Sequence, residues 1–152
     1  MMSTNVASGV RIAGAGGAGM FMNSLALPSA GGGLRLGIDV SILSPDRLVT
    51  YLARGVAEDF PERVGRFLRD ASVADDGDAP RPFEETEAGL LITVTPIDGM
   101  WAVMEVRIAE NLDDDVVEFD GINFETSRAS LLIAAEVAAA LGGVVSGSEG
   151  GQ

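Results

Sequence analysis

The chain has 152 residues, of which 23 are Asp or Glu and 10 are Arg, while His, Cys and Lys are absent. These absences exclude imidazole and thiolate chemistry, disulfide bonds and zinc sites built from Cys or His. The formal net charge of −13 argues against nucleic acid or an anionic membrane as a partner, because clustered basic side chains bind phosphate groups. The same charge favours a basic partner protein.

A chain of this length can bury one cohesive core without cross-links. We expect a single domain over residues 10–143, with a flexible N-terminus at residues 1–9 and a flexible C-terminal tail at residues 144–152. No apolar run approaches the roughly 20 residues that cross a bilayer, and the N-terminal residues match a secretory signal poorly. The sequence therefore predicts a cytoplasmic protein without a membrane segment.

In the first half of the chain, residues 20–27 are predicted to form a strand. Apolar and polar residues alternate over residues 34–42, and this period of two predicts a second strand. Residues 44–60 are predicted to form a helix. Ser44 is a suitable N-cap, Pro45 suits the first helical position, and an apolar stripe recurs at helical spacing. A second short helical segment is expected at residues 62–69.

In the second half, residues 70–88 carry seven carboxylates and are predicted to form an exposed acidic loop. Alternation resumes at residues 90–94, and Asp98-Gly99 indicates a hairpin turn. The returning strand, residues 100–108, has Met104, Val106 and Ile108 on one face. Trp101, Glu105 and Arg107 are expected on the other.

Residues 117–124 are predicted as a further strand, bent or bulged at Gly121. The last helix is expected to start at Thr126 or Ser127 and to end at Gly142-Gly143.

The resulting order is ββαβββα, with neighbouring strands joined by hairpins. It predicts an α+β fold in which a mainly antiparallel sheet of about five strands carries two helices on one face. We expect no internal repeat. An uncovered sheet face and an unpaired edge strand are compatible with a homodimer.

Residues 14–19 match the pattern G-x-G-x-x-G, and Asp39 follows the last glycine after twenty residues. This spacing resembles the fingerprint of dinucleotide-binding domains, in which a helix must follow the glycines. Here Pro28 and the glycines at 31–33 interrupt any such helix, so a turn between two strands is the preferred interpretation. A nucleotide- or small-ligand-binding protein that uses the loop from Gly14 to Gly19 stays an alternative.

Two acidic runs, Asp75-Asp76-Gly77-Asp78 and Asp113-Asp114-Asp115, carry oxygen ligands of the kind that Ca²⁺ and Mg²⁺ prefer. Neither has the spacing of an EF-hand loop, and we expect solvated turns. A metal-assisted hydrolase built on Asp and Glu clusters is a further alternative. Because no nucleophile or phosphate-binding motif is present, we expect neither catalytic residues nor a cofactor.

The leading hypothesis is a non-catalytic, acidic protein-binding module, of the physical type of an immunity or antitoxin-like inhibitor that blocks a basic partner protein. Trp101 is the residue to test as an anchor, since large aromatic side chains dominate many interfaces. The alternative is that Trp101 folds over the hairpin or is covered by the Gly/Ala-rich segment. The expected partner-binding residues are Trp101, Glu105, Asp75, Asp76, Asp78, Glu84, Glu85, Asp113, Asp114 and Asp115.

Overall fold

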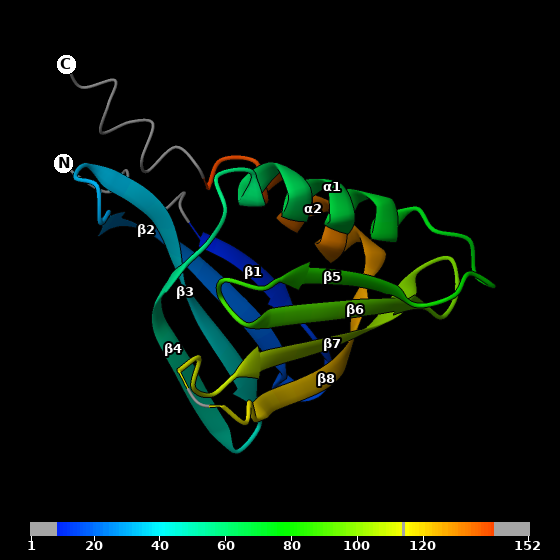
Figure 1. Ribbon diagram of the computed structural model, residues 1–152. Coiled ribbons are helices and arrows are strands. Elements are labelled where there is room, and N and C mark those ends of the chain that lie inside the picture. The colour runs from blue at the N-terminus through cyan, green and yellow to red at the C-terminus, as the bar shows by residue number, and fades with distance from the viewer. Residues whose placement is uncertain (1–8, 114, 142–152) are drawn as a thin grey trace, which may run out of the picture.

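The computed structural model describes residues 9–113 and 115–141, which form an α+β fold with two antiparallel sheets of four strands each and two helices (Figure 1). The N-terminal sheet contains β1 (Gly9–Ala13), β2 (Gly19–Pro28), β3 (Leu34–Ser44) and β4 (Arg47–Gly55), and α1 (Phe60–Ser72) follows it. The C-terminal sheet contains β5 (Arg81–Glu85), β6 (Leu90–Pro96), β7 (Trp101–Ala109) and β8 (Phe119–Ser127), and α2 (Arg128–Ala138) follows it.

Each half of the chain is thus a four-stranded meander followed by a helix. The strand order within each sheet is the order along the chain. The predicted single sheet and the order ββαβββα are wrong in these details. The two halves share their order of elements but not their residue spacing, so this similarity leaves no periodic signal in the sequence.

The helix predicted at residues 44–60 is strand β4. The same residues also fit the two-residue period of a strand. Val49 and Tyr51 point inward, whereas Leu48 and Leu52 are 63% and 68% exposed. Both periods fit this short segment, and pairing with β3 decides between them because a tight turn follows Ser44. The register between β3 and β4 shifts at a bulge between Ile38 and Val40.

Strands β2, β3, β6, β7 and β8 form where the sequence predicts strands, and β3, β6 and β7 have the predicted alternation. The predicted hairpin at Asp98 forms, with Asp98 Oδ1 accepting hydrogen bonds from the backbone N–H groups of Met100 (2.8 Å) and Trp101 (3.0 Å). Two details differ. Strand β5 lies within the predicted acidic loop, and Gly121 pairs with Arg107 without a register shift instead of forming a bulge.

The helices begin near their predicted starts. Helix α1 is longer than expected, and its N-terminal residues Phe60 and Pro61 are buried. Helix α2 is capped by Ser127, whose hydroxyl accepts a hydrogen bond from the backbone N–H of Ser130 (3.1 Å). The predicted stop at residues 142–143 lies outside the described residues, as do the predicted flexible ends except Gly9, which begins β1.

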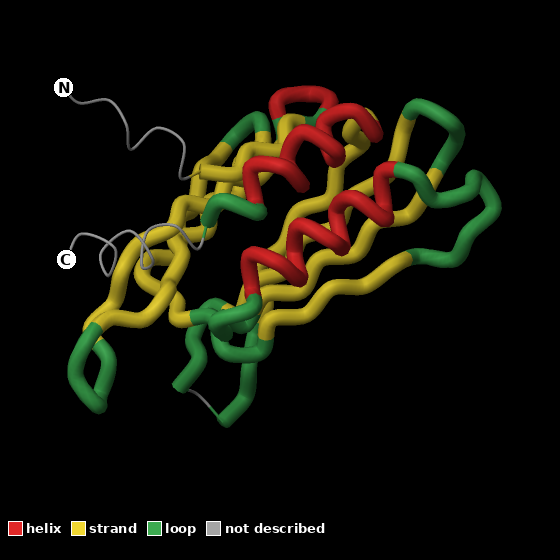
Figure 2. Tube along the Cα trace, turned by 90° about the horizontal axis from the view of Figure 1, so that it is seen from above, coloured by secondary structure: helices red, strands yellow, loops and turns green. Residues whose placement is uncertain are grey.

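The core lies between the inner faces of the two sheets. On one side the helices lie side by side and close the space between the edge strands β1 and β5, where Phe83 contacts the rings of Phe60 and Phe67 (Figures 1 and 2). On the opposite side, β4 and β8 meet. The helices therefore do not cover one face of a single sheet, as predicted, and the outer face of each sheet is left uncovered.

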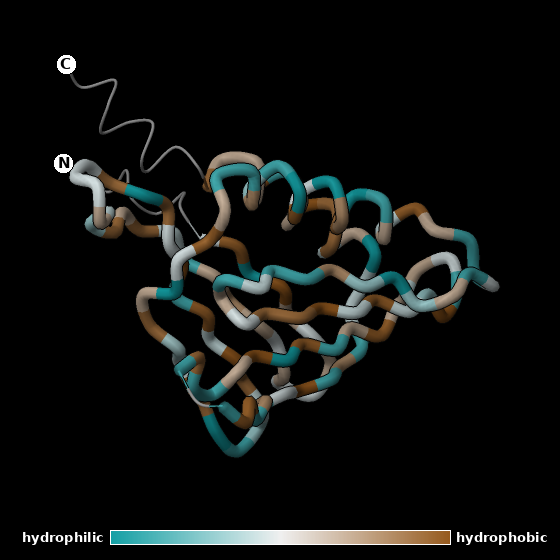
Figure 3. The backbone as a smooth tube through the Cα atoms, viewed as in Figure 1, coloured by the Kyte–Doolittle hydropathy of each residue, from teal (hydrophilic) through white to brown (hydrophobic). Residues whose placement is uncertain are grey.

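Hydrophobic and hydrophilic positions alternate along the strands, as Figure 3 shows for the C-terminal sheet. Within the described residues, neither helix is long and apolar enough to traverse a bilayer.

Candidate functional site

Trp101 lies on the outer face of the C-terminal sheet, as the alternation of β7 predicts. Its neighbours at every second position, Val103, Glu105 and Arg107, are exposed or half-buried, while the intervening residues of β7 are buried. Trp101 itself is 42% exposed. We call this surface the C-terminal sheet face and define it by Glu84, Thr93, Trp101, Glu105, Arg107 and Glu125, none of which is buried.

A polar depression of about 420 Å³ lies on the C-terminal sheet face. It forms beside Gly121, which is paired with Arg107 and has no side chain to cover the strand. Glu105 and Arg107 form an exposed ion pair of 3.3 Å along one edge, and Phe119, 50% exposed, lies on the other strand. The depression thus combines both charges with one aromatic ring.

The two predicted acidic runs do not come together. One lies in the connection from α1 to β5 and the other in the connection from β7 to β8, so the antiparallel order places them at opposite ends of the C-terminal sheet (Figure 1). Among the described residues, no group of three or more carboxylates is arranged to hold a metal ion. The described residues therefore contain no such group that could serve the metal site of a hydrolase.

Several of the predicted acidic residues are already bound within the chain. Asp76 pairs with Arg128 (3.1 Å), and Asp78 pairs with Arg81 (3.3 Å). Glu85 is only 2% exposed, on the inner side of β5.

The Glu85 carboxylate accepts hydrogen bonds from the Arg63 guanidinium and from the backbone N–H of Ala57 (2.9 Å). This buried carboxylate holds α1 to the C-terminal sheet and is not available to a partner. No side-chain hydrogen bond or ion pair is formed by the carboxylates of Asp75, Glu84, Asp113 and Asp115 in the described residues, whereas Asp114 lies outside them.

Sequence reasoning missed the polar cluster of Arg47, Tyr51 and Asp120, where β4 meets β8. The Tyr51 hydroxyl donates to Asp120 Oδ2 (2.8 Å), and the Arg47 guanidinium donates to Oδ1. Burial, together with the hydrogen bond to Asp120, raises the pKa of Tyr51 to about 12. Burial alone would raise the pKa of Asp120, but the hydrogen bonds from Arg47 and Tyr51 hold that pKa below its usual value.

Nothing in the sequence points to this cluster, because Tyr51 and Asp120 are 69 positions apart. Both carboxylate oxygens of Asp120 are bonded within the cluster, so we interpret it as a structural clasp between the sheets.

The glycine-rich segment forms the turn between β1 and β2, as preferred from the sequence. One short 3₁₀ turn (Ala15–Gly17) reverses the chain, with φ of 71° at Gly16 and 82° at Gly17. An antiparallel strand follows, not a helix. The helix N-terminus that binds pyrophosphate in dinucleotide-binding domains is therefore missing here, and the resemblance to that fingerprint is one of letters alone.

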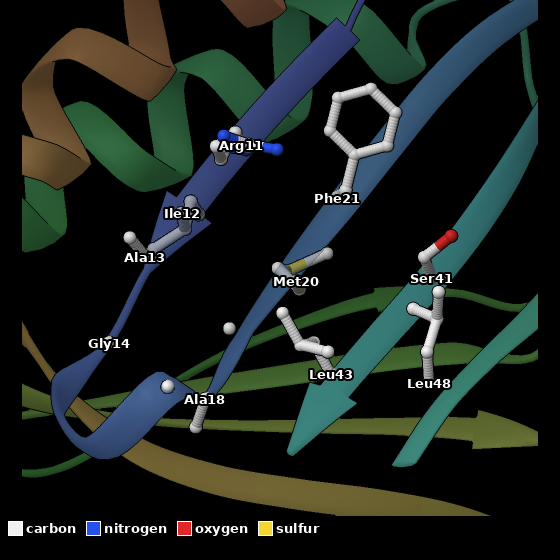
Figure 4. Close-up of a pocket in the computed structure, with 12 residues that line it drawn as sticks. Arg11, Ile12, Ala13, Gly14, Ala18, Met20, Phe21, Ser41, Leu43 and Leu48 are labelled. Carbon is white, nitrogen blue, oxygen red and sulfur yellow. The ribbon is translucent and has the colours of Figure 1, made fainter. Parts of the chain in front are cut away.

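Beside this turn, an apolar hollow of about 450 Å³ opens on the outer face of the N-terminal sheet (Figure 4). Two neighbouring rows of cross-strand partners and the glycine turn line it. The rows are Arg11, Phe21 and Ser41 in one, and Ala13, Gly19, Leu43 and Leu48 in the other. We call this feature the sheet hollow. The sequence carried one signal for it, namely the small residues around position 19.

No protein-family model and no curated protein sequence matches this chain. Among solved structures, the plant transcriptional regulator PBF-2 is similar in fold, with a TM-score of 0.47 and 10% sequence identity, over 94% of this chain and 84% of that chain. A similarity at this level carries no argument about function.

The buried carboxylate Glu85 and the largely buried Asp120 are each neutralised by an Arg. The two hollows differ in character: the one on the C-terminal sheet face is polar, and the sheet hollow is mainly apolar.

Proposed function

We propose that this chain is a non-catalytic protein-binding module whose C-terminal sheet face receives a basic partner protein. The observation that carries the proposal is the exposed Trp101 on a sheet face that no helix covers, with Glu125 diagonally across on β8 and Glu105 four residues further along β7 on the same face. Trp is the residue type most enriched among interface anchors, because it buries a large rigid surface on association.

Charge supports a basic partner. Glu84 and Glu125 lie on strands β5 and β8, and neither forms an ion pair within the described residues. The exposed Asp113 and Asp115 lie beyond the β7 end of the same sheet. Trp101 is the first residue of β7, and most of these carboxylates lie along the sheet toward the other end of that strand. Carboxylates in this arrangement steer a positively charged surface toward the face and select against acidic competitors. We further propose that the module acts as an inhibitor of the immunity or antitoxin type, which covers a basic active site of its partner.

The test is a pull-down from the native source at low and high salt, with the wild-type chain as bait. We expect a basic protein whose capture falls steeply between about 50 and 500 mM salt, because the Debye length shrinks over this range. If the captured protein is an enzyme, adding this chain at equimolar concentration should suppress its activity. A neutral partner whose capture ignores salt would contradict the proposal.

Matched variants then locate the interface. Trp101→Ala should weaken binding of the captured protein by at least about 30-fold, as expected for an anchor worth 2 kcal/mol or more. Glu84→Gln and Glu125→Gln should slow association. Glu136→Gln, which removes the same charge from the exposed side of α2, is the control and should leave association unchanged. Equal effects at Glu136 and Glu125 would show that only net charge matters and would reject this face as the interface.

A further inference from the structure

The sheet hollow lies on the other sheet and has a different chemistry from the C-terminal sheet face. Its floor is formed by small residues, since Ala13 and Gly19 are paired at this point of the β1–β2 hairpin. A Cβ atom at Gly19 would lie 2.7 Å from the carbonyl oxygen of Ile12, so no side chain can occupy this position without moving the hairpin. The fold therefore keeps the floor open.

The aromatic ring beside the hollow does not close it. The Phe21 ring leans over Gly9, where a Cβ atom would lie 2.5 Å from the ring carbon Cζ. Gly9 is at the end of β1 remote from Ala13, so the ring points away from the glycine turn, as Figure 4 shows. The Phe21 ring thus occupies the space that a side chain at Gly9 would fill, and the hollow stays accessible.

The opposite wall is made of leucine side chains from two further strands. Leu43 and Leu48 are paired across β3 and β4 and are 43% and 63% exposed. Exposed leucine side chains around a hollow of this size match the apolar lining that is typical of pockets for small molecules.

Arg11 is the single charged side chain that lines the sheet hollow. It is exposed and forms no ion pair or hydrogen bond within the described residues, although seven of the ten Arg residues of this acidic chain pair with a carboxylate. Among the described residues, no carboxylate lines the hollow. An apolar hollow with one unneutralised guanidinium at its edge complements a molecule with a hydrocarbon body and one anionic head.

We propose that the sheet hollow binds a free fatty carboxylate of medium chain length. Its hydrocarbon chain lies over Ala13 and Gly19, between the leucine side chains and the glycine turn, and its carboxylate pairs with Arg11. The net negative charge of the chain opposes the anion only through carboxylates outside this lining, and charges further away than about 8 Å are largely screened at physiological ionic strength. The proposal does not rest on the proposed function, although Ala13 and Gly14 border both the sheet hollow and a depression that Trp101 lines.

The first experiment is calorimetric titration with hexanoate, octanoate and decanoate below their micelle concentrations. Burial of the hydrocarbon predicts that affinity rises with chain length, by up to about fourfold for each methylene that enters the hollow. Saturable binding with this dependence is the expected result. No saturable binding of decanoate, or an affinity that does not change with chain length, would overturn the proposal.

Variants separate the two parts of the ligand. Arg11→Met should weaken the affinity for octanoate by about three- to tenfold, as expected for a charge-assisted hydrogen bond at an exposed site. The affinity for 1-octanol should stay within about twofold of the wild-type value. Arg69→Met is the matched control, because Arg69 is also exposed and unpaired in the described residues but lies on α1. Equal weakening of octanoate and octanol by Arg11→Met would overturn the role of the charge.

Ala13→Phe should abolish binding of both ligands by filling the hollow. Since Ala13 is exposed, this variant is expected to fold, which circular dichroism and the melting temperature check. In case it does not fold, amide chemical-shift mapping of the wild-type chain serves the same purpose: decanoate should perturb β1, β2 and the glycine turn. Perturbation confined to β7 and β8 would overturn the site.

Two further outcomes also count against it. If light scattering shows a dimer that Leu48→Asp converts to a monomer, and octanoate does not bind, a second copy of the chain occupies this face. If the chain binds vesicles of phosphatidylcholine and phosphatidylglycerol but no free carboxylate, the apolar surface belongs to a membrane contact.

Discussion

The Tyr51 hydroxyl donates a hydrogen bond of 2.8 Å to Asp120 and so ties the edge strand of the N-terminal sheet to that of the C-terminal sheet. Arg47 bonds the other oxygen of the same carboxylate. Both oxygens of Asp120 are occupied, so the clasp holds β4 and β8 together on the side of the two sheets that the helices do not close.

Tyr51→Phe is expected to lower the free energy of unfolding by about 1.5 kcal/mol at pH 7, because the variant removes a hydrogen bond to a charged acceptor. The pKa of Tyr51 is raised to about 12 in the folded state, from about 10 in an unfolded chain. The clasp therefore stabilises the fold fully below pH 10 and loses this contribution as the pH rises toward 12.

Urea unfolding of both proteins between pH 8 and 12 measures this effect, and the stability of the wild type should fall toward that of Tyr51→Phe. A constant difference over the whole range would mean that Tyr51 titrates equally in both states.

Glu85→Ala should lower the free energy of unfolding by about 2 kcal/mol. The variant leaves the backbone N–H of Ala57 and one side of the Arg63 guanidinium without their acceptor. This loss of stability is smaller than the loss expected when a fully buried ion pair is broken, since Arg63 also pairs with Asp59 (3.0 Å) and is partly exposed. Glu84→Ala, on the outer side of the same strand, is the control and should change stability by less than about 0.5 kcal/mol. Equal losses at both positions would argue that β5 does not have this orientation.

Gly14→Ala should be destabilising by about 1–3 kcal/mol, because the new Cβ atom would lie 2.3 Å from a ring carbon of the buried Phe124. Gly31→Ala is the comparison. No atom lies within 4 Å of its Cβ position and its φ is not positive, so the free energy of unfolding should stay equal or rise slightly. Thermal or chemical unfolding of the two variants tests whether the glycine turn is packed against β8.

Leu52→Ala should change the free energy of unfolding by less than about 0.5 kcal/mol, because Leu52 is 68% exposed on β4. Val49→Ala should cost about 1 kcal/mol, since Val49 is half-buried and packs against the core. The order is reversed if residues 44–60 form a helix with Leu48, Leu52 and Val56 inside. A larger loss at Leu52 than at Val49 would therefore contradict strand β4.

The sequence was informative wherever a pattern was strictly local. The alternation along β7 correctly placed Trp101 and Glu105 on the face opposite Met104 and Val106. The helix predicted at β4 was wrong, because the leucine spacing of a helix coincides there with a strand whose outer face is apolar. An exposed leucine is indistinguishable in sequence from a buried one, and only pairing with β3 selects the strand.

The candidate sites show the same division. Composition alone determined that His, Cys and Lys chemistry is absent and that the chain is strongly acidic, and alternation determined which residues share a face. Tertiary structure decided which acids are free, because Glu85 meets Arg63 and Asp120 meets Tyr51 only after elements distant in sequence pack together. It also decided that the glycine turn borders a hollow lined by β1–β4. The reason is physical: side-chain periodicity follows from backbone geometry within one element, whereas ion pairs and cavities depend on how separate elements approach one another.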